Sequence, residues 1–200
     1  MKVLIKTAAP RRILQWILQW IHVALFAAGI LMLGYCAFVV ADTWIFQKQE
    51  AAALESFVPQ ALVPSPAVVG PAGLIGRLQV ERLGVSAMVM EGISGKTLRR
   101  AVGHISGTAL PGQSGNVGIA GHRDTFFRPL RNIQADDIIT LTTLGGEYRY
   151  RVVSTKVVSP DNVAVLDSDS HEILTLVTCY PFYFLGSAPE RFIVRAERVT

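Results

Sequence analysis

Cysteine is scarce in this sequence, which has only Cys36 and Cys179. Cys36 lies inside a long apolar run, so we do not expect the two thiols to meet as a disulfide. The sequence also lacks a CxxC pair and a Cys/His cluster, and these absences argue against a zinc site. Cys179 therefore remains as the single candidate functional thiol.

Net charge is also small once the N-terminus is set aside. The formal charge of +4 comes from 19 basic and 15 acidic residues. Four of the basic residues precede residue 13 with no acid among them: Lys2, Lys6, Arg11 and Arg12. The other 15 basic residues balance the 15 acidic ones. A nucleic-acid-binding domain carries its own basic stripe, so nucleic acid is not an expected partner.

Ionisable side chains are almost absent between Ile21 and Ala41, where His22 is the only one apart from Tyr35 and Cys36. A helix over residues 21–41, rising about 1.5 Å per residue, spans the roughly 30 Å hydrocarbon core of a bilayer. Tryptophans at positions 16, 20 and 44 flank it, as in interfacial aromatic belts. We therefore predict a basic tail over residues 1–20 and one transmembrane helix over residues 21–41. By the positive-inside tendency the N-terminus is cytoplasmic and the remainder extracytoplasmic.

A cleaved signal peptide is the alternative for this segment, because Val39-Val40-Ala41 resembles a small-residue cleavage site. The apolar stretch exceeds the about 7–15 residues of a signal core, so we expect an uncleaved anchor in the cell membrane. Residues 42–73 contain four prolines between Pro59 and Pro71 and are interpreted as an extracytoplasmic stalk or linker. The folded domain is expected over residues 74–200.

Long helical patterns are lacking in that domain, and short strands with turn signals take their place. Residues 76–81, 85–91 and 116–121 are predicted to be strands, and residues 137–143 are expected to pair with 148–158 across Gly145-Gly146. Residues 96–102 and 126–133 are expected to form short helical turns. Many short strands with few helices favour a mainly β fold, either a barrel or a sandwich.

The stretch from Ile173 to Arg195 reads as two short apolar strands joined by a loop rich in aromatic residues, Gly and Pro. Cys179 ends the first strand and Arg191 opens the second. Because side chains alternate along a strand, Arg191 and Arg195 share one face of the second strand. If the strands lie side by side, a thiol and a guanidinium open onto one groove.

A cysteine nucleophile needs a base or an electropositive neighbour to supply the thiolate. His122 directly follows a predicted strand that ends in Gly121, and glycine allows a close backbone approach and an exposed turn. We expect His104 and His171 to be structural or solvated. The residues alone leave open whether Cys179 is catalytic or a buried small hydrophobe.

Three motifs in this order resemble the sortase family. They are the histidine of GHRDTFF, the TLVTC strand that ends at Cys179, and an arginine twelve residues later. The similarity covers roughly Ile75 to Glu197, and the segment CYPFYFLGSAPERFIVRA looks most like class D sortases. The resemblance implies an eight-stranded β-barrel, with Cys179 as nucleophile and His122 as acid/base. It implies Arg191 as the stabiliser of the oxyanion and the substrate backbone, and Arg195 is the second choice for that role.

The resemblance also implies a reaction. A cysteine transpeptidase of this kind cleaves the Thr–Gly or Thr–Ala bond of a Leu-Pro-any-Thr sorting signal, forms a thioacyl-enzyme, and transfers the protein to an amine acceptor. The expected partners are secreted proteins with a C-terminal sorting signal, and an amine from a cell-wall precursor or another protein. A thiol hydrolase on the same scaffold and a non-catalytic peptide-binding module are the alternatives.

Some sortases bind calcium through an acidic loop that precedes the histidine. Residues 92–121 contain no Asp or Glu in this chain. We therefore expect neither a structural calcium ion nor a cofactor. Asp124 is also close to the histidine in sequence, and the sequence does not decide whether it orients the ring of His122 or only solvates the loop.

Overall fold

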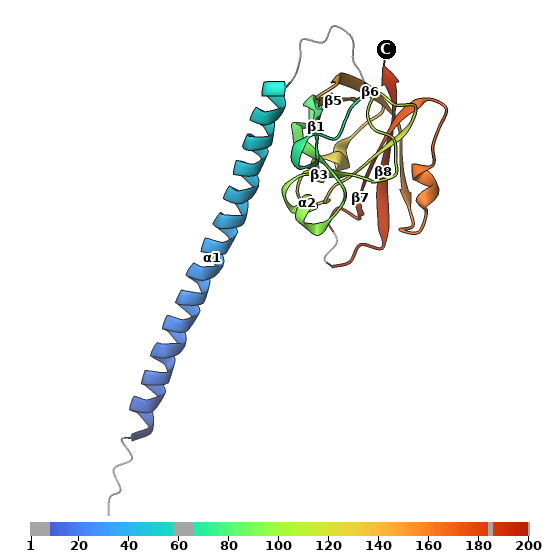
Figure 1. Ribbon diagram of the computed structural model, residues 1–200. Helices are drawn as coiled ribbons and strands as arrows, with labels where there is room; N and C mark the ends of the chain where they lie inside the picture. Colours follow the sequence, from blue (N-terminus) through green and yellow to red (C-terminus); the bar gives the residue numbers. More distant parts are fainter. Residues whose placement is uncertain (1–8, 58–65, 184–185, 200) are drawn as a thin grey trace, which may run out of the picture. The chain divides into compact units, whose positions relative to one another are not determined.

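The computed structural model describes residues 9–57, 66–183 and 186–199 (Figure 1). The chain divides into two compact units, one that ends at Asp42 and one that starts at Thr43. The described part of the first unit, residues 9–42, is helical, and the second unit contains the barrel (Figure 1).

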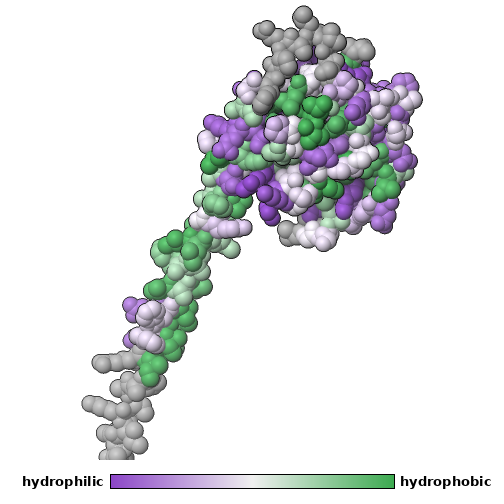
Figure 2. Space-filling view, in the orientation of Figure 1, coloured by the Kyte–Doolittle hydropathy of each residue, from purple (hydrophilic) through white to green (hydrophobic). Residues whose placement is uncertain are grey.

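Helix α1 (Ala9–Phe57) is a single helix of 49 residues and contains the predicted span over residues 21–41. It continues past Asp42 because residues 42–57 are rich in helix formers and contain neither Gly nor Pro. Hydrophobic side chains cover much of its surface (Figure 2). The helix is long and apolar enough to cross a membrane. The boundaries predicted at residues 20, 41 and 73 stay predictions, and residues 58–65 of the expected stalk lie outside the described residues.

The last turns of α1 belong to the second unit. Leu54 is only 1% exposed and lies in a small apolar cluster with Leu74, Met88, Met90 and Ala101. The side-chain amide of Gln47 donates to the carbonyl of Arg100 at 2.6 Å and accepts from the backbone N–H of Met88 at 2.9 Å. The C-terminal turns of helix α1, at least from Gln47 to Leu54, are therefore part of the folded unit.

Eight strands close into one barrel in the order β1-β2-β3-β4-β7-β8-β6-β5, and pairing of β1 with β5 closes it. This confirms the predicted eight-stranded β-barrel with few helices. The strands are β1 (Leu74–Val80), β2 (Val85–Glu91), β3 (Val102–His104), β4 (Gly115–Ala120), β5 (Ile138–Thr143), β6 (Gly146–Val158), β7 (Glu172–Tyr180) and β8 (Glu190–Val199). The short helical elements are α2 (Gly95–Arg100), η1 (Pro71–Gly73), η2 (Glu81–Leu83), η3 (Arg128–Asn132) and η4 (Val163–Leu166).

Alternation of side chains explains why these segments form a barrel wall. In β6 the aromatic and aliphatic residues Tyr148, Tyr150 and Val152 point into the core, while Arg149 and Arg151 between them are exposed. β-Branched and aromatic residues of this kind suit a half-buried pleated surface. Twenty buried residues from the strands and the loop after β4 form the barrel core.

The predicted hairpin turn at Gly145-Gly146 is wrong by one residue. Thr143 pairs with Gly146, so the two turn residues are Leu144 and Gly145. The reason is local hydrogen bonding by Thr143. Its hydroxyl accepts from the N–H of Gly145 at 3.0 Å and donates to the carbonyl of Gly146 at 3.1 Å, which fixes Gly146 as the first strand residue.

Candidate active site

Cys179 and Arg191 lie directly opposite each other on neighbouring strands. In the antiparallel ladder of β7 and β8, Cys179 is the register partner of Arg191. Directly opposite residues in such a ladder have Cβ atoms about 4.5–5.5 Å apart. Leu176 and Val194 point into the core, so Cys179 and Arg191, which have the opposite parity, lie on the outer face. The fold thus places the thiol and the guanidinium on one surface.

His122 enters this surface from β4, which runs parallel to β7. Ala120 is the register partner of Val177, and the N–H of Gly121 donates to the carbonyl of Val177 at 3.1 Å. The buried hydroxyl of Thr178 then donates to the carbonyl of Gly121 at 2.8 Å. The same register carried two residues beyond Ala120 brings the backbone of His122 level with Cys179. The His122 residue is exposed, and Cys179 is partly buried with a free thiol.

Gly121 is required at this point because the chain passes very close to an aromatic ring. A Cβ atom on Gly121 would lie 2.7–2.9 Å from ring atoms of Phe127. Phe127 has no exposed surface, and its N–H donates to the carbonyl of His122 at 3.1 Å. The buried ring of Phe127 therefore packs against the turn that carries His122 and supports it.

Arg191 keeps hydrogen-bond donors available on the outer face. Its Nη1 donates to the carbonyls of Glu190 at 3.0 Å and Ala188 at 3.3 Å. Within the described residues, the Nε and Nη2 groups of Arg191 make no hydrogen bond. A guanidinium has five N–H donors, so Arg191 can be anchored to its own loop and still donate to a substrate oxygen.

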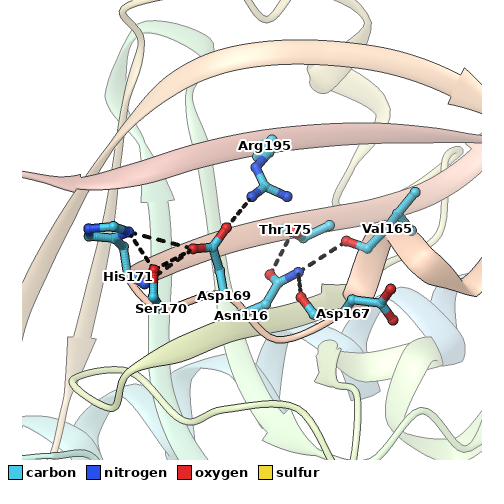
Figure 3. Close-up of polar contacts among 8 residues, drawn as sticks. All are labelled: Asn116, Val165, Asp167, Asp169, Ser170, His171, Thr175 and Arg195. Atoms are coloured by element: carbon cyan, nitrogen blue, oxygen red, sulfur yellow. Dashed lines mark hydrogen bonds and ion pairs between the residues drawn. The ribbon is translucent and has the colours of Figure 1, made fainter.

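Arg195, the second choice for that role, lies elsewhere. Its register partner is Thr175, four residues before Cys179, which corresponds to about 13 Å along the strand. Its Nη2 donates to the Asp169 carboxylate at 2.9 Å (Figure 3). The backbone N–H of His171 lowers the pKa of Asp169 and keeps this carboxylate ionised for the pair. Arg195 therefore fastens the β6–β7 loop and does not reach the thiol through the ladder.

The same loop is held from below by Asn116 on β4. The side-chain amide of Asn116 donates to the carbonyls of Val165 at 3.0 Å and Asp167 at 3.2 Å (Figure 3). Its oxygen accepts from the hydroxyl of Thr175 at 2.7 Å. Asn116 is 2% exposed and Thr175 is fully buried, so the bond between these two side chains is closed to water. A polar residue at the start of a predicted buried strand is a signal that could have marked Asn116 in advance, because buried polar groups are almost always partnered.

The other histidines are not part of this surface. His104 is 3% exposed, and its Nδ1 lies 2.7 Å from the Glu91 carboxylate while its Nε2 lies 3.0 Å from the carbonyl of Ala109. His171 is exposed in the β6–β7 loop. Within the described part of the chain, no hydrogen bond joins Asp124 to His122, and no group of three or more His, Cys, Asp or Glu side chains is placed to hold a metal ion.

Arg123, the residue after His122, makes contacts that the sequence did not indicate. Its Nη1 donates to the carbonyl of Pro181 and its Nη2 to the carbonyl of Gly186, both at 3.0 Å. Both carbonyls belong to the loop between Cys179 and Arg191. Phe182 of this loop packs edge-on against Phe192 with ring centroids 5.3 Å apart, and both rings contact the barrel core. The loop is thus fixed both to the core and to the histidine turn.

Comparison with known proteins gives a consistent result. The family model of the sortase domain matches residues 78–199, which include all three candidate residues. Sortase D of Bacillus subtilis is 30% identical over 188 residues, covering 87% of this chain and 95% of that protein. The solved structure of a Clostridium perfringens Sortase D5 transpeptidase has 28% identity and a TM-score of 0.60, covering 76% of this chain and 88% of that one. The structure of sortase C-1 from Actinomyces oris has 26% identity and a TM-score of 0.61, and the match covers 76% of this chain and 97% of that one.

Proposed function

The chain belongs to the sortase family of cysteine transpeptidases and is class D-like, and from this premise we propose that it cleaves a Leu-Pro-any-Thr sorting signal and transfers the carboxyl side of the threonine to an amine. The observation that carries this proposal is the register of β7 and β8, which sets Cys179 opposite Arg191. The N–H of Gly121, directly after β4, donates to the carbonyl of Val177, and this supports a position of His122 beside that pair.

In the first half-reaction, the thiolate of Cys179 attacks the carbonyl carbon of the threonine. The carbonyl π electrons move to oxygen, and the resulting oxyanion needs fixed donors aimed at it. Collapse of the tetrahedral intermediate breaks the C–N bond and leaves a thioester on Cys179. The protonated imidazole of His122 gives its proton to the departing amine, which leaves with the downstream peptide.

In the second half-reaction, an acceptor amine attacks the thioester carbonyl and gives its proton to His122. The C–S bond breaks, a new amide bond forms, and the thiolate is released. Water in place of the amine gives hydrolysis with the same proton balance. The acceptor therefore decides between ligation and hydrolysis, and the residues of the enzyme play the same roles in both.

Arg191 is our choice for the oxyanion donor and for orienting the substrate backbone. Its position opposite Cys179 and its donors on the outer face support this role. Arg195 is disfavoured because it lies four residues along the strand and pairs with Asp169.

We further propose that α1 anchors the protein in the cell membrane with the N-terminus in the cytoplasm and the barrel outside. The apolar stretch between Ile21 and Ala41 and the four basic residues before position 13 support this orientation. Substrates are then secreted proteins whose sorting signals reach the barrel on the outer side of the cell membrane. The amine acceptor is a component of the cell envelope.

The test uses the full chain in detergent micelles with an internally quenched peptide that contains a Leu-Pro-any-Thr signal. We expect cleavage after threonine that is lost on Cys179→Ala and falls strongly on His122→Ala and Arg191→Ala. Cys36→Ala is the matched control, since it removes the other free cysteine and leaves the proposed site intact. Adding an amine acceptor should yield a ligated product by mass spectrometry. Cleavage that survives Cys179→Ala would refute the proposal.

A further inference from the structure

Arg123 bridges two points of the loop that connects the strand of Cys179 to the strand of Arg191. The acceptors are the carbonyls of Pro181 and Gly186, and each receives one N–H from a different terminal nitrogen of the same guanidinium at 3.0 Å. These two carbonyls are five residues apart in the chain. A planar guanidinium with donors in a fixed fork matches this arrangement, whereas the single ammonium of lysine does not.

The bridge acts on the histidine turn as well as on the loop. Arg123 directly follows His122, and Gly121 before it is bound to β7 through Val177 and Thr178. A short stretch of chain on both sides of His122 is therefore tied to the β7 strand and to the loop beyond it. The loop cannot move away from the barrel without breaking the bonds of Arg123 or shifting the turn of His122.

Arg191 is tied to the far end of the same loop. Its Nη1 donates to the carbonyls of Ala188 and Glu190. Two guanidinium groups thus bind the described part of the loop backbone, Arg123 at Pro181 and Gly186 and Arg191 at Ala188. The three proposed reacting groups come from three different chain segments, and Arg123 forms hydrogen bonds from the segment of the histidine to the loop between the other two.

We propose that Arg123 is a positioning residue that holds the His122 turn and the Cys179–Arg191 loop in one geometry, and this inference rests on the function proposed above. Misplacing a reacting group by about 1 Å can slow an enzyme about 100-fold. Replacing Arg123 is therefore expected to lower turnover while the thiol itself stays intact and accessible.

The experiment compares Arg123→Ala and Arg123→Lys with Arg128→Ala in the full chain. Arg128 is a suitable control because it is exposed, lies five residues further on, and has no side-chain hydrogen bond among the described residues. We expect Arg123→Ala to lower kcat for the sorting-signal peptide about 100-fold, with a smaller change in KM. Arg123→Lys should recover less than a tenth of the lost activity, and guanidinium ion at non-denaturing concentration should partly restore Arg123→Ala.

Two further measurements separate positioning from general disruption. The rate of Cys179 alkylation by iodoacetamide at pH 10 should stay within about twofold of wild type, because an ordinary thiol with a pKa of about 8.5 ionises there without help from His122 and the small reagent then needs only access. Hydrogen exchange should become faster in peptides that span residues 181–190 in Arg123→Ala and stay unchanged in Arg128→Ala. This second measurement does not require activity, so it still tests the bridge if the wild-type chain fails to cleave the peptide.

Turnover of Arg123→Ala within twofold of wild type would overturn the inference, as would full activity in Arg123→Lys. A parallel fall of turnover and of alkylation at pH 10 would do the same, because it would assign the effect to loss of the site as a whole. Unchanged hydrogen exchange in Arg123→Ala would show that the bridge does not hold the loop. Failure of the wild-type chain to cleave any sorting-signal peptide counts against the proposed function instead.

Discussion

Removal of the Asn116 side chain should unfasten the β6–β7 loop and destabilise the barrel. Asn116→Ala deletes three hydrogen bonds and leaves the hydroxyl of Thr175 and the carbonyl of Val165 without their partner in a buried site. A buried polar group left unpaired costs about 1–3 kcal/mol. Two such groups give an expected loss of about 4 kcal/mol in the free energy of unfolding, whereas the exposed Asp167 can bond to water.

Asn116→Asp is the sharper form of this test because it keeps the size of the side chain. A carboxylate would aim an oxygen at the carbonyls of Val165 and Asp167, where the amide of Asn116 now donates two hydrogen bonds. It would also bury a charge without a cation. We expect a loss at least as large as that of Asn116→Ala at pH 7. Protonation of the new carboxyl group at acidic pH restores one donor, so the loss should shrink as the pH falls.

Thr175→Val completes a double-mutant cycle with Asn116→Ala. Each single change leaves one partner of the buried hydrogen bond unpaired, and the double change removes both. The double variant should therefore lose less stability than the sum of the two single variants, by about 1–2 kcal/mol. Additive losses would show that the two side chains do not act through each other.

The assay has to report on the barrel and not on helix α1. All three tryptophans, at positions 16, 20 and 44, lie in α1, so their fluorescence is a poor probe of barrel unfolding. Calorimetry of the full chain in micelles reads the barrel transition directly, and a loss of 4 kcal/mol should lower its Tm by roughly 10–15 °C. Asn162→Ala is the matched control, since Asn162 is exposed in the same loop and makes no side-chain cap. Equal Tm values for Asn116→Ala and Asn162→Ala would refute the reasoning.

Three other changes test separate parts of the fold. A hydrogen bond from Arg82 lowers the pKa of the buried Asp137, so its stabilising effect is complete above about pH 4 and is lost as the pH falls through the folded pKa. Asp137→Asn should lower the free energy of unfolding by about 2 kcal/mol in denaturant titrations at pH 7. The difference in unfolding free energy between wild type and variant should shrink below pH 4, and a difference that does not change with pH would contradict this. Gly121→Ala places a Cβ against the ring of Phe127, so it should lower the free energy of unfolding by about 1–3 kcal/mol. It should also reduce peptide cleavage more than tenfold. Normal cleavage would show that the His122 turn tolerates the extra methyl group. Leu54→Ala should lower the barrel Tm through a loss of about 2–4 kcal/mol, and an unchanged Tm would mean that α1 does not stabilise the barrel.

The strand order and the candidate residues could be approached from the sequence to different degrees. Alternation in Tyr148 to Val152 and the apolar stretch ending at Cys179 identify strands without any structure. Closure of the barrel through β1 and β5 does not follow from periodicity, because pairing between distant strands leaves no local pattern. The prediction of an eight-stranded barrel came instead from the resemblance of the motifs to the sortase family.

The choice between Arg191 and Arg195 shows where sequence reasoning stops. Period two puts both arginines on one face, and both satisfy the chemical requirement of an oxyanion donor. Register separates them, since Arg191 is opposite Cys179 and Arg195 is opposite Thr175. Register depends on the whole ladder and on the length of the loop between the strands, and neither is written in the residues near the arginines.

Helix α1 ends later than the apolar run that marks it because polarity does not stop a helix. Residues 42–57 lose hydrophobicity but contain strong helix formers and no breaker. Hydropathy predicts where a membrane span lies, whereas Gly and Pro predict where a helix ends. The two signals separate here by 16 residues (57 − 41), between Ala41 and Phe57.

The proposed site is assembled from the ends of three neighbouring strands, so its geometry depends on contacts that lie beyond the ladders. The β4–β7 ladder ends at Val177. Beyond it, the hydroxyl of Thr178 and the guanidinium of Arg123 form the hydrogen bonds that connect the two segments. The Arg123 contacts lie at the surface or are only partly buried, so their loss should change Tm less than it changes turnover. A core substitution such as Leu54→Ala should do the reverse, and the ratio of the two effects therefore distinguishes residues that place the reacting groups from residues that only keep the barrel folded.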